Sequence, residues 1–143
     1  MTIRHLDRLL SPGSVAVFGA SNRPGSVGAT VWRNLRAGQF AGPIYGVNPR
    51  HATLDGVPVF ASARELPAAP DLALLCTPAH TVAPLVAELG ALGTRAVIIV
   101  TAGLTGAQKQ AALDAAKPHL VRLLGPNCIG LLKIGRASCR ERV

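Results

Sequence analysis

Five short apolar runs divide the chain, and a polar or glycine-rich stretch follows each of them. They span residues 14–18, 43–47, 71–76, 95–100 and 121–124. Polar residues hardly interrupt these runs and many of their members are β-branched, which is typical of strands covered on both faces. The pattern therefore predicts five buried strands.

Segments with helical spacing lie between these runs. The apolar positions that share one helical face are Val27, Val31 and Leu35 in the first segment and Val82, Val86 and Leu89 in the second. We expect Gly38 and Gly90 to end these two helices and Thr81 to cap the second. An alanine-rich third segment, 106–117, is expected to be helical up to Pro118.

Strands that alternate with helices of this length imply right-handed crossovers and a parallel sheet. The sequence therefore predicts an α/β fold: a Rossmann-like, doubly wound, mainly parallel sheet with helices on both faces. Its 143 residues are the length of a single domain. The less regular segment 55–70 is expected to hold a short strand at 57–60 and a helical turn near Ala63.

The last ten residues, 134–143 (IGRASCRERV), differ in composition from the rest of the chain. They are polar, include three arginines, and can be encoded by a common short-read sequencing adapter translated in frame. We interpret 1–133 as the domain, 134–143 as a non-native tail, and the natural chain as continuing beyond the cut. The formal charge is +8, but without this tail the basic excess is modest, and with one Trp and one Tyr a nucleic-acid partner is not expected.

The chain shows no sign of a membrane segment, a secretory signal or a metal site. No apolar run approaches the roughly 18 residues that span a bilayer, and the first ten residues lack a signal-peptide core, so we expect a cytoplasmic protein with no membrane partner. Cysteines and histidines are few and lack metal-ligand spacing. They are Cys76, Cys128, Cys139, His5, His51, His80 and His119. Cys128 has no partner of the kind a nucleophile needs, so no catalytic residue is predicted.

Ligands of open parallel sheets lie beyond the carboxyl ends of the strands, which directs attention to the residues after each run. The first ending, GASNRPGSVG at 19–28, combines a glycine turn with Ser26 at the start of a helix, where backbone N–H groups favour an anion. Its glycines are spaced more widely than the nicotinamide fingerprint G-x-G-x-x-G, and no G-K-[ST] follows them. This loop predicts a phosphate site without naming the ligand.

The second ending bears on the choice of ligand. An NAD site has Asp or Glu after the second strand, whereas this chain has Asn48, Pro49, Arg50 and His51. Arg50 could bind the 2′-phosphate of NADP or the 3′-phosphate of coenzyme A, or it could be a solvated surface charge.

The third and fourth endings consist of small residues and hydroxyls, against which an extended ligand could lie. They are Thr77, Pro78 and Ala79, and Thr101, Ala102 and Gly103. Ordinary turn chemistry is the alternative interpretation of both.

Taken together, the strand endings resemble a known family. LLSPGSVAVFGASNRPGSVG, GPIYGVNPR, DLALLCTPAHTV, AVIIVTAGL and LLGPNCIG, over about residues 6–132, are similar to the coenzyme A-binding domain of ADP-forming acyl-CoA synthetases. This superfamily includes the succinyl-CoA synthetase alpha subunit. The first block is especially similar to fused forms that carry an N-acetyltransferase domain.

The resemblance implies that these loops bind coenzyme A. Phosphates or pantetheine would lie on Gly19, Ser21, Asn22 and Gly25, the adenosine phosphate on Asn48, Pro49 and Arg50, and the rest of the ligand on Thr77, Pro78, Ala79, Thr101, Ala102 and Gly103. Such synthetases convert acid, ATP and coenzyme A to acyl-CoA, ADP and phosphate through a phosphohistidine in a later domain.

Neither that histidine nor the ATP-grasp half is matched in this chain. We therefore expect a module that binds coenzyme A or acyl-CoA, that needs the missing downstream synthetase domains as partners, and that could form an oligomer. A complete stand-alone coenzyme A-binding protein and an NADP-binding oxidoreductase domain are the alternatives.

Overall fold

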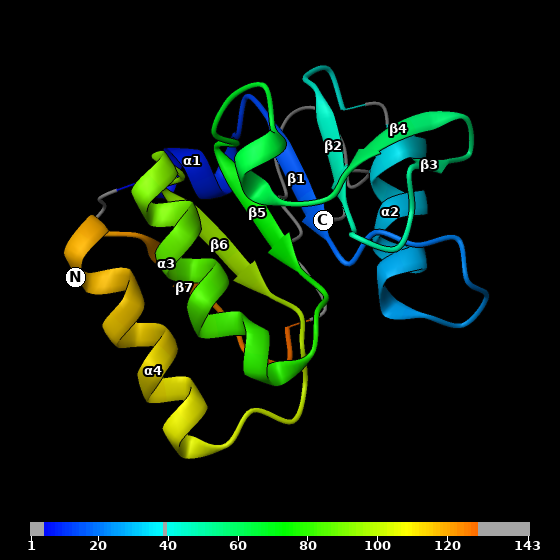
Figure 1. Cartoon of the computed structure of the whole chain (residues 1–143). Coiled ribbons are helices and arrows are strands. Elements are labelled where there is room, and N and C mark those ends of the chain that lie inside the picture. Colours follow the sequence, from blue (N-terminus) through cyan, green and yellow to red (C-terminus); the bar gives the residue numbers. More distant parts are fainter. Residues whose placement is uncertain (1–4, 39, 129–143) are drawn as a thin grey trace.

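The chain folds around a seven-stranded sheet in this computed structural model, which describes residues 5–38 and 40–128 (Figure 1). The strands are β1 (Val15–Phe18), β2 (Ile44–Val47), β3 (Thr53–Leu54), β4 (Val57–Phe60), β5 (Leu72–Leu75), β6 (Ala96–Ile99) and β7 (Arg122–Leu124). Their order in the sheet is β3-β4-β2-β1-β5-β6-β7, and every pair is parallel except the β3–β4 hairpin. The predicted α/β class and the five predicted strands are confirmed.

Helices cover both faces of the sheet. They are α1 (Leu6–Leu10), α2 (Val27–Ala37), α3 (Val82–Leu92) and α4 (Gly106–Ala116), with short 3₁₀ turns η1 (Ala63–Glu65), η2 (Ala79–Thr81) and η3 (Lys117–His119). The buried side chains of α1 and α2 belong to one apolar cluster, and those of α3 and α4 belong to the other. Figure 1 shows α3 and α4 side by side on one face, with α2 on the opposite side of the sheet.

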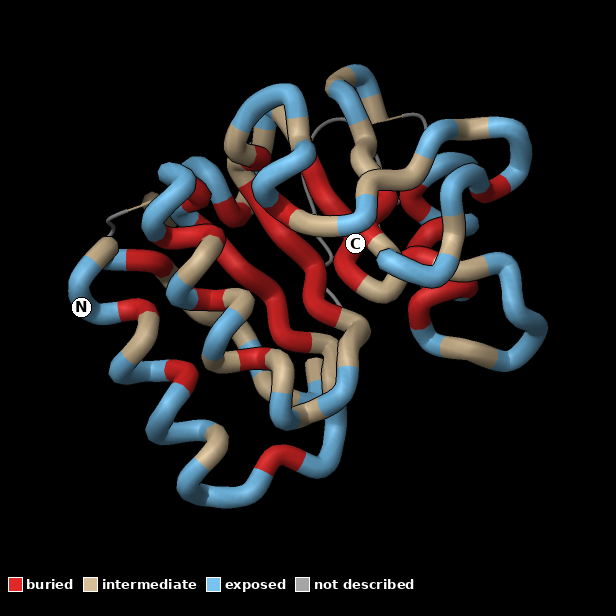
Figure 2. The backbone as a smooth tube through the Cα atoms, in the orientation of Figure 1, coloured by how far each residue is buried: buried red, intermediate tan, exposed pale blue. Residues whose placement is uncertain are grey.

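Alternate residues of the central strands point into these two clusters. On β1, Val15 and Val17 face the α1/α2 side, and Ala16 and Phe18 face the α3/α4 side. β5 and β6 alternate in the same way, so the centre of the sheet is buried on both sides (Figure 2). This burial on both faces explains why the runs are apolar at every position rather than at every second one.

Local signals fix most helix ends. The Ser26 hydroxyl caps α2 by accepting a hydrogen bond from the Ala29 N–H at 3.1 Å, and Gly38 follows its last turn as predicted. Thr105 and Gln108 form a reciprocal capping box at the start of α4. The expected strand at 57–60 and the turn at Ala63 are also present.

Three helix predictions were wrong in detail. α3 continues through Gly90 and ends at Gly93, whose φ of +107° suits glycine, because Gly90 leaves room for the ring of His119 instead. Thr81 does not cap α3 with its side chain, since its backbone is already helical (φ −91°, ψ −11°) at the end of η2. Val27, expected on the buried face, is 56% exposed because it occupies the first turn of α2.

The winding of the chain creates a switch point between β1 and β5. From β1 the chain moves outward to β2 and β4, and then returns to the other side of β1 as β5. Crossovers therefore leave the carboxyl ends of β1 and β5 in opposite directions, which opens a crevice there. The boundary at residue 133 and the tail 134–143 lie outside the described residues.

Candidate functional site

A cleft of about 580 Å³ lies at this switch point. The predicted residues that line it are Gly19, Asn48, Pro49, Arg50, Thr77 and Pro78. The other predicted residues are not part of its lining: Ser21, Asn22, Gly25, Ala79, Thr101, Ala102 and Gly103. The structure thus brings together parts of the first three strand endings.

Sequence reasoning missed ten of the sixteen residues that line the cleft. Its remaining walls are Phe18, Arg23, Val47, Ala61, Ser62, Ala63, Cys76, Thr81, Leu85 and Glu88. Residues 61–63 directly follow the strand that was expected at 57–60, so the rule about strand ends could have found them. Leu85 and Glu88 follow Thr81 at helical spacing, and only the way in which α3 packs shows that this face meets the cleft.

Two glycines hold the first loop against the sheet. Gly19 has a φ of +87°, and a Cβ there would lie 2.5 Å from the Cys76 carbonyl oxygen. A Cβ on Gly28, at the start of α2, would overlap the Gly19 carbonyl. These are the roles of the turn glycine and of the helix-packing glycine in dinucleotide-binding loops, but here residues 20–27 separate them.

Hydrogen bonds shape the loop between these glycines. The Ser21 hydroxyl accepts from the Arg23 N–H at 2.9 Å, and the Ser26 hydroxyl donates to the Arg23 carbonyl at 2.9 Å. Ser21 is predicted to contact the phosphates or the pantetheine of coenzyme A, and in the structure its hydroxyl stabilises the turn that carries Arg23. The backbone of Arg23, a residue that lines the cleft, is thereby fixed.

Asn48 connects the first loop to the second. Its amide Nδ2 donates to the Ala20 carbonyl at 2.9 Å, and its Oδ1 accepts from the Arg50 N–H at 2.9 Å. Among the described residues, no carboxylate forms a salt bridge with Arg50 or Arg23. The cleft therefore presents two uncompensated guanidinium groups on loops whose backbones are anchored, an arrangement suited to phosphate.

Threonine hydroxyls tie the third and fourth endings together. The Thr101 hydroxyl lies 2.7 Å from the Thr77 carbonyl oxygen, and the Thr81 hydroxyl donates to the Thr77 hydroxyl at 2.8 Å. Thr101 therefore supports the wall of the cleft from behind, although it does not line it.

Cys76 lies in the wall of the cleft, where burial raises the pKa of its thiol to about 12 from an ordinary value of 9.0. The neutral thiol is a poor nucleophile. At pH 8 we expect iodoacetamide to label Cys76 about a thousandfold more slowly in the folded chain than in urea, as thiolate fractions require. Peptide mass spectrometry measures both rates, and equal rates would contradict the burial argument.

The described residues include neither a candidate metal cluster nor a membrane-spanning helix. No group of three or more His, Cys, Asp or Glu side chains in 5–38 and 40–128 could hold a metal ion. Within the same ranges, no helix has the length and apolar character needed to cross a bilayer.

The fold and the cleft define the class of the protein: a Rossmann-like, doubly wound domain with a cleft at its switch point. Residues 13–133 match the model of the family described as CoA binding domain. The chain belongs to this family of coenzyme A-binding domains, in agreement with the predicted resemblance and cofactor.

Proteins similar in sequence to this chain include ADP-forming CoA ligases and a feruloyl-CoA synthase. The chain is 36% identical to acetate–CoA ligase (ADP-forming) I of Archaeoglobus fulgidus over an alignment of 133 residues that covers 89% of this chain and 19% of the relative. It is 41% identical to trans-feruloyl-CoA synthase FCS1 of an unknown prokaryotic organism, with the same coverage of both chains. The chain therefore spans about a fifth of the length of these relatives.

A solved structure shares the fold. It is that of the dinucleotide-forming acetyl-coenzyme A synthetase 1 of Ca. Korarchaeum cryptofilum in complex with phosphate and ADP. The TM-score is 0.82 at 29% identity, over 87% of this chain and 28% of the other.

Proposed function

We propose that the cleft at the switch point is where this chain binds coenzyme A, and that the chain serves as the coenzyme A-binding part of an ADP-forming acyl-CoA synthetase. The match of residues 13–133 to the coenzyme A-binding family carries this proposal. Arg50 supports it, because a cation lines the cleft where NAD-binding domains place a carboxylate.

The anchored loops suggest how the ligand lies. Arg50, held through Asn48, would bind the 3′-phosphate of the adenosine. The loop from Gly19 to the start of α2, with Arg23, would face the pyrophosphate. Pantetheine would then pass Thr77 and Pro78 toward the fourth ending. Contacts between coenzyme A and the predicted residues that do not line the cleft stay predictions; these residues are Ser21, Asn22, Gly25, Ala79, Thr101, Ala102 and Gly103.

In the proposed parent enzyme, acid and ATP would react in domains beyond this chain. Relatives named for acetate and for trans-feruloyl-CoA are 36% and 41% identical to this region. We therefore expect that this domain does not determine which acid the parent enzyme uses. Its own residues would bind and orient coenzyme A with no catalytic group. Four expectations from the sequence stay predictions: a parent protein fused to an acetyltransferase domain, an oligomeric state, a cytoplasmic location and, as the alternative, a stand-alone coenzyme A-binding protein. A stop codon directly after Val143 in the genomic sequence would contradict the proposal that this chain is part of a longer synthetase.

Calorimetry of the whole chain with coenzyme A, dephospho-coenzyme A and NADP tests the proposed ligand. A charge-assisted contact to the 3′-phosphate should make coenzyme A bind about tenfold to a hundredfold more tightly than its dephospho form. NADP, whose phosphate is on the 2′-oxygen, is expected to bind more weakly than coenzyme A. Tighter binding of NADP would support the oxidoreductase alternative and reject the proposal.

A further inference from the structure

The cleft carries a carboxylate that binding of phosphates does not explain. Among the residues that line it, Glu88 is the one acidic side chain, and this side chain is 29% exposed. A ligand with several phosphates is repelled by a carboxylate unless it presents a hydrogen-bond donor there. Glu88 therefore indicates which part of the ligand lies at its end of the cleft.

Glu88 is placed by two elements. It follows Thr81 and Leu85 on one face of α3, at spacings of four and three residues, and all three side chains line the cleft. Arg64 of η1 reaches across to it, with Nε lying 3.5 Å from Oε1. Apart from this ion pair, the Glu88 carboxylate has no hydrogen bond or salt bridge among the described residues, so it retains acceptor capacity toward the cleft.

The surroundings of Glu88 are apolar. Phe18, Val47 and Ala63 belong to the buried cluster on this face of the sheet, and Leu85 packs against it. All four also line the cleft, beside the segment that crosses in front of the sheet from β4 to η1 (Figure 1). An apolar surface beside one carboxylate suits a flat heterocycle that carries an amino group.

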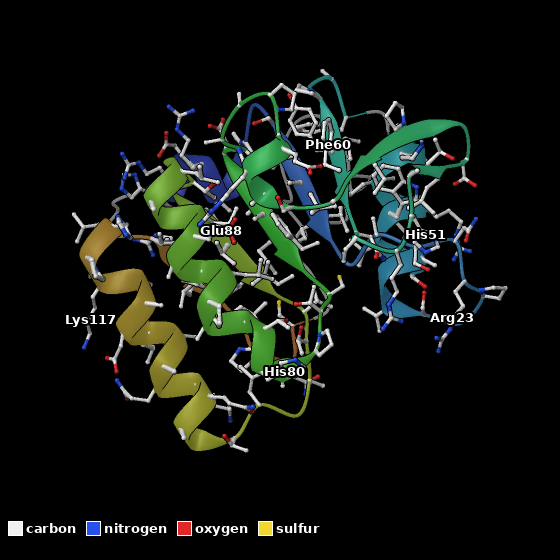
Figure 3. All side chains as sticks on the ribbon, viewed as in Figure 1. Arg23, His51, Phe60, His80, Glu88 and Lys117 are labelled. Carbon is white, nitrogen blue, oxygen red and sulfur yellow. The ribbon has the colours of Figure 1, made fainter. Side chains whose placement is uncertain are left out.

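The cationic side of the cleft lies elsewhere. Figure 3 shows Glu88 on α3 and Arg23 in the loop before α2, well apart on the two sides of the molecule. Arg50 belongs to the loop after β2, which lies on the far side of β1 from β5, the strand that precedes α3. A ligand that spans this arrangement has phosphates at one end and an uncharged donor group at the other.

We infer that Glu88, oriented by Arg64, accepts a hydrogen bond from the exocyclic amino group of the adenine ring and so selects the base of the ligand. This inference rests on the proposed binding of coenzyme A in this cleft. Glu88 acts as a specificity residue, and Arg64 acts through it as a positioning residue.

The test compares two ligands that differ only in that amino group: adenosine 3′,5′-bisphosphate and purine riboside 3′,5′-bisphosphate. Neither contains pantetheine, whose amide groups are the other donors of coenzyme A. Because the acceptor is charged, the whole chain should bind the adenosine compound about tenfold to a hundredfold more tightly. Calorimetry measures both affinities.

Variants assign the preference to Glu88. Glu88→Met removes the acceptor and should bind both bisphosphates equally, whereas Glu88→Gln keeps a neutral acceptor and should retain part of the preference. Asp114→Asn, which removes one negative charge on α4 outside the cleft lining, should retain all of it. Thermal unfolding of each variant confirms that it is folded, and Glu88→Gln serves if Glu88→Met is not.

Each outcome decides between the two claims. If the parent chain binds coenzyme A but does not distinguish the bisphosphates, or if Glu88→Met keeps the full preference, the role of Glu88 is wrong and the proposed function stands. If the parent chain binds neither coenzyme A nor adenosine 3′,5′-bisphosphate, the proposed function fails and the role of Glu88 fails with it.

Discussion

Replacing Gly28 with alanine is expected to lower the free energy of unfolding by about 3 kcal/mol, as overpacking against an immobile neighbour does. The new methyl group would overlap the Gly19 carbonyl oxygen. Gly19 cannot move away, because its N–H donates to the Val47 carbonyl at 2.9 Å and its Cα lies against the Cys76 carbonyl. The start of α2 must therefore shift outward, which also displaces the loop that carries Arg23.

Gly106→Ala is the matched control. Gly106 begins α4 as Val27 and Gly28 begin α2, but no neighbouring atom lies within 4 Å of its Cβ position and its φ is not positive. This change should leave the chain unaltered or stabilise it by less than about 1 kcal/mol. Urea unfolding followed by circular dichroism compares the two variants. Equal stability of Gly28→Ala and Gly106→Ala would show that α2 is not packed against the first loop.

The central strands could be predicted because burial on both faces requires a continuous apolar run in the sequence. β1, β5 and β6 are buried on both faces, so every position must be apolar. Helix ends were less predictable where a glycine has two possible reasons to be present. Gly90 was expected to end α3, but it accommodates His119, a residue from a distant part of the chain. Only the tertiary structure distinguishes these two roles.

At the cleft, too, residues placed by the sheet topology could be predicted from the sequence, whereas residues placed by helix packing could not. The strand-end rule found Gly19, Asn48 and Arg50, because topology alone brings such residues to one edge. It did not find Glu88, which lies in the middle of α3 and reaches the cleft through helix packing. Nor does the sequence show that the Asn48 side chain forms hydrogen bonds with the backbones of Ala20 and Arg50. The bond to Ala20 joins two loops that are distant in the sequence and meet only at the edge of the folded sheet.

Arg50→Ala should weaken coenzyme A binding about tenfold to a hundredfold and leave dephospho-coenzyme A nearly unaffected. The guanidinium would contact the 3′-phosphate, which only the first ligand carries. Because the Arg50 N–H is held by Asn48 and its side chain has no salt-bridge partner among the described residues, the substitution removes a cation without disturbing an internal ion pair. The fold should therefore be retained.

Arg33→Ala controls for the general loss of a positive charge. Arg33 is exposed on α2 and does not line the cleft, so the ratio of the two affinities should match that of the parent chain. Arg50→Lys should keep part of the preference, since an ammonium retains the charge but loses the bidentate geometry. If Arg50→Ala keeps the full preference while Arg23→Ala loses it, the 3′-phosphate lies on the first loop and the orientation of the ligand in the cleft must be reversed.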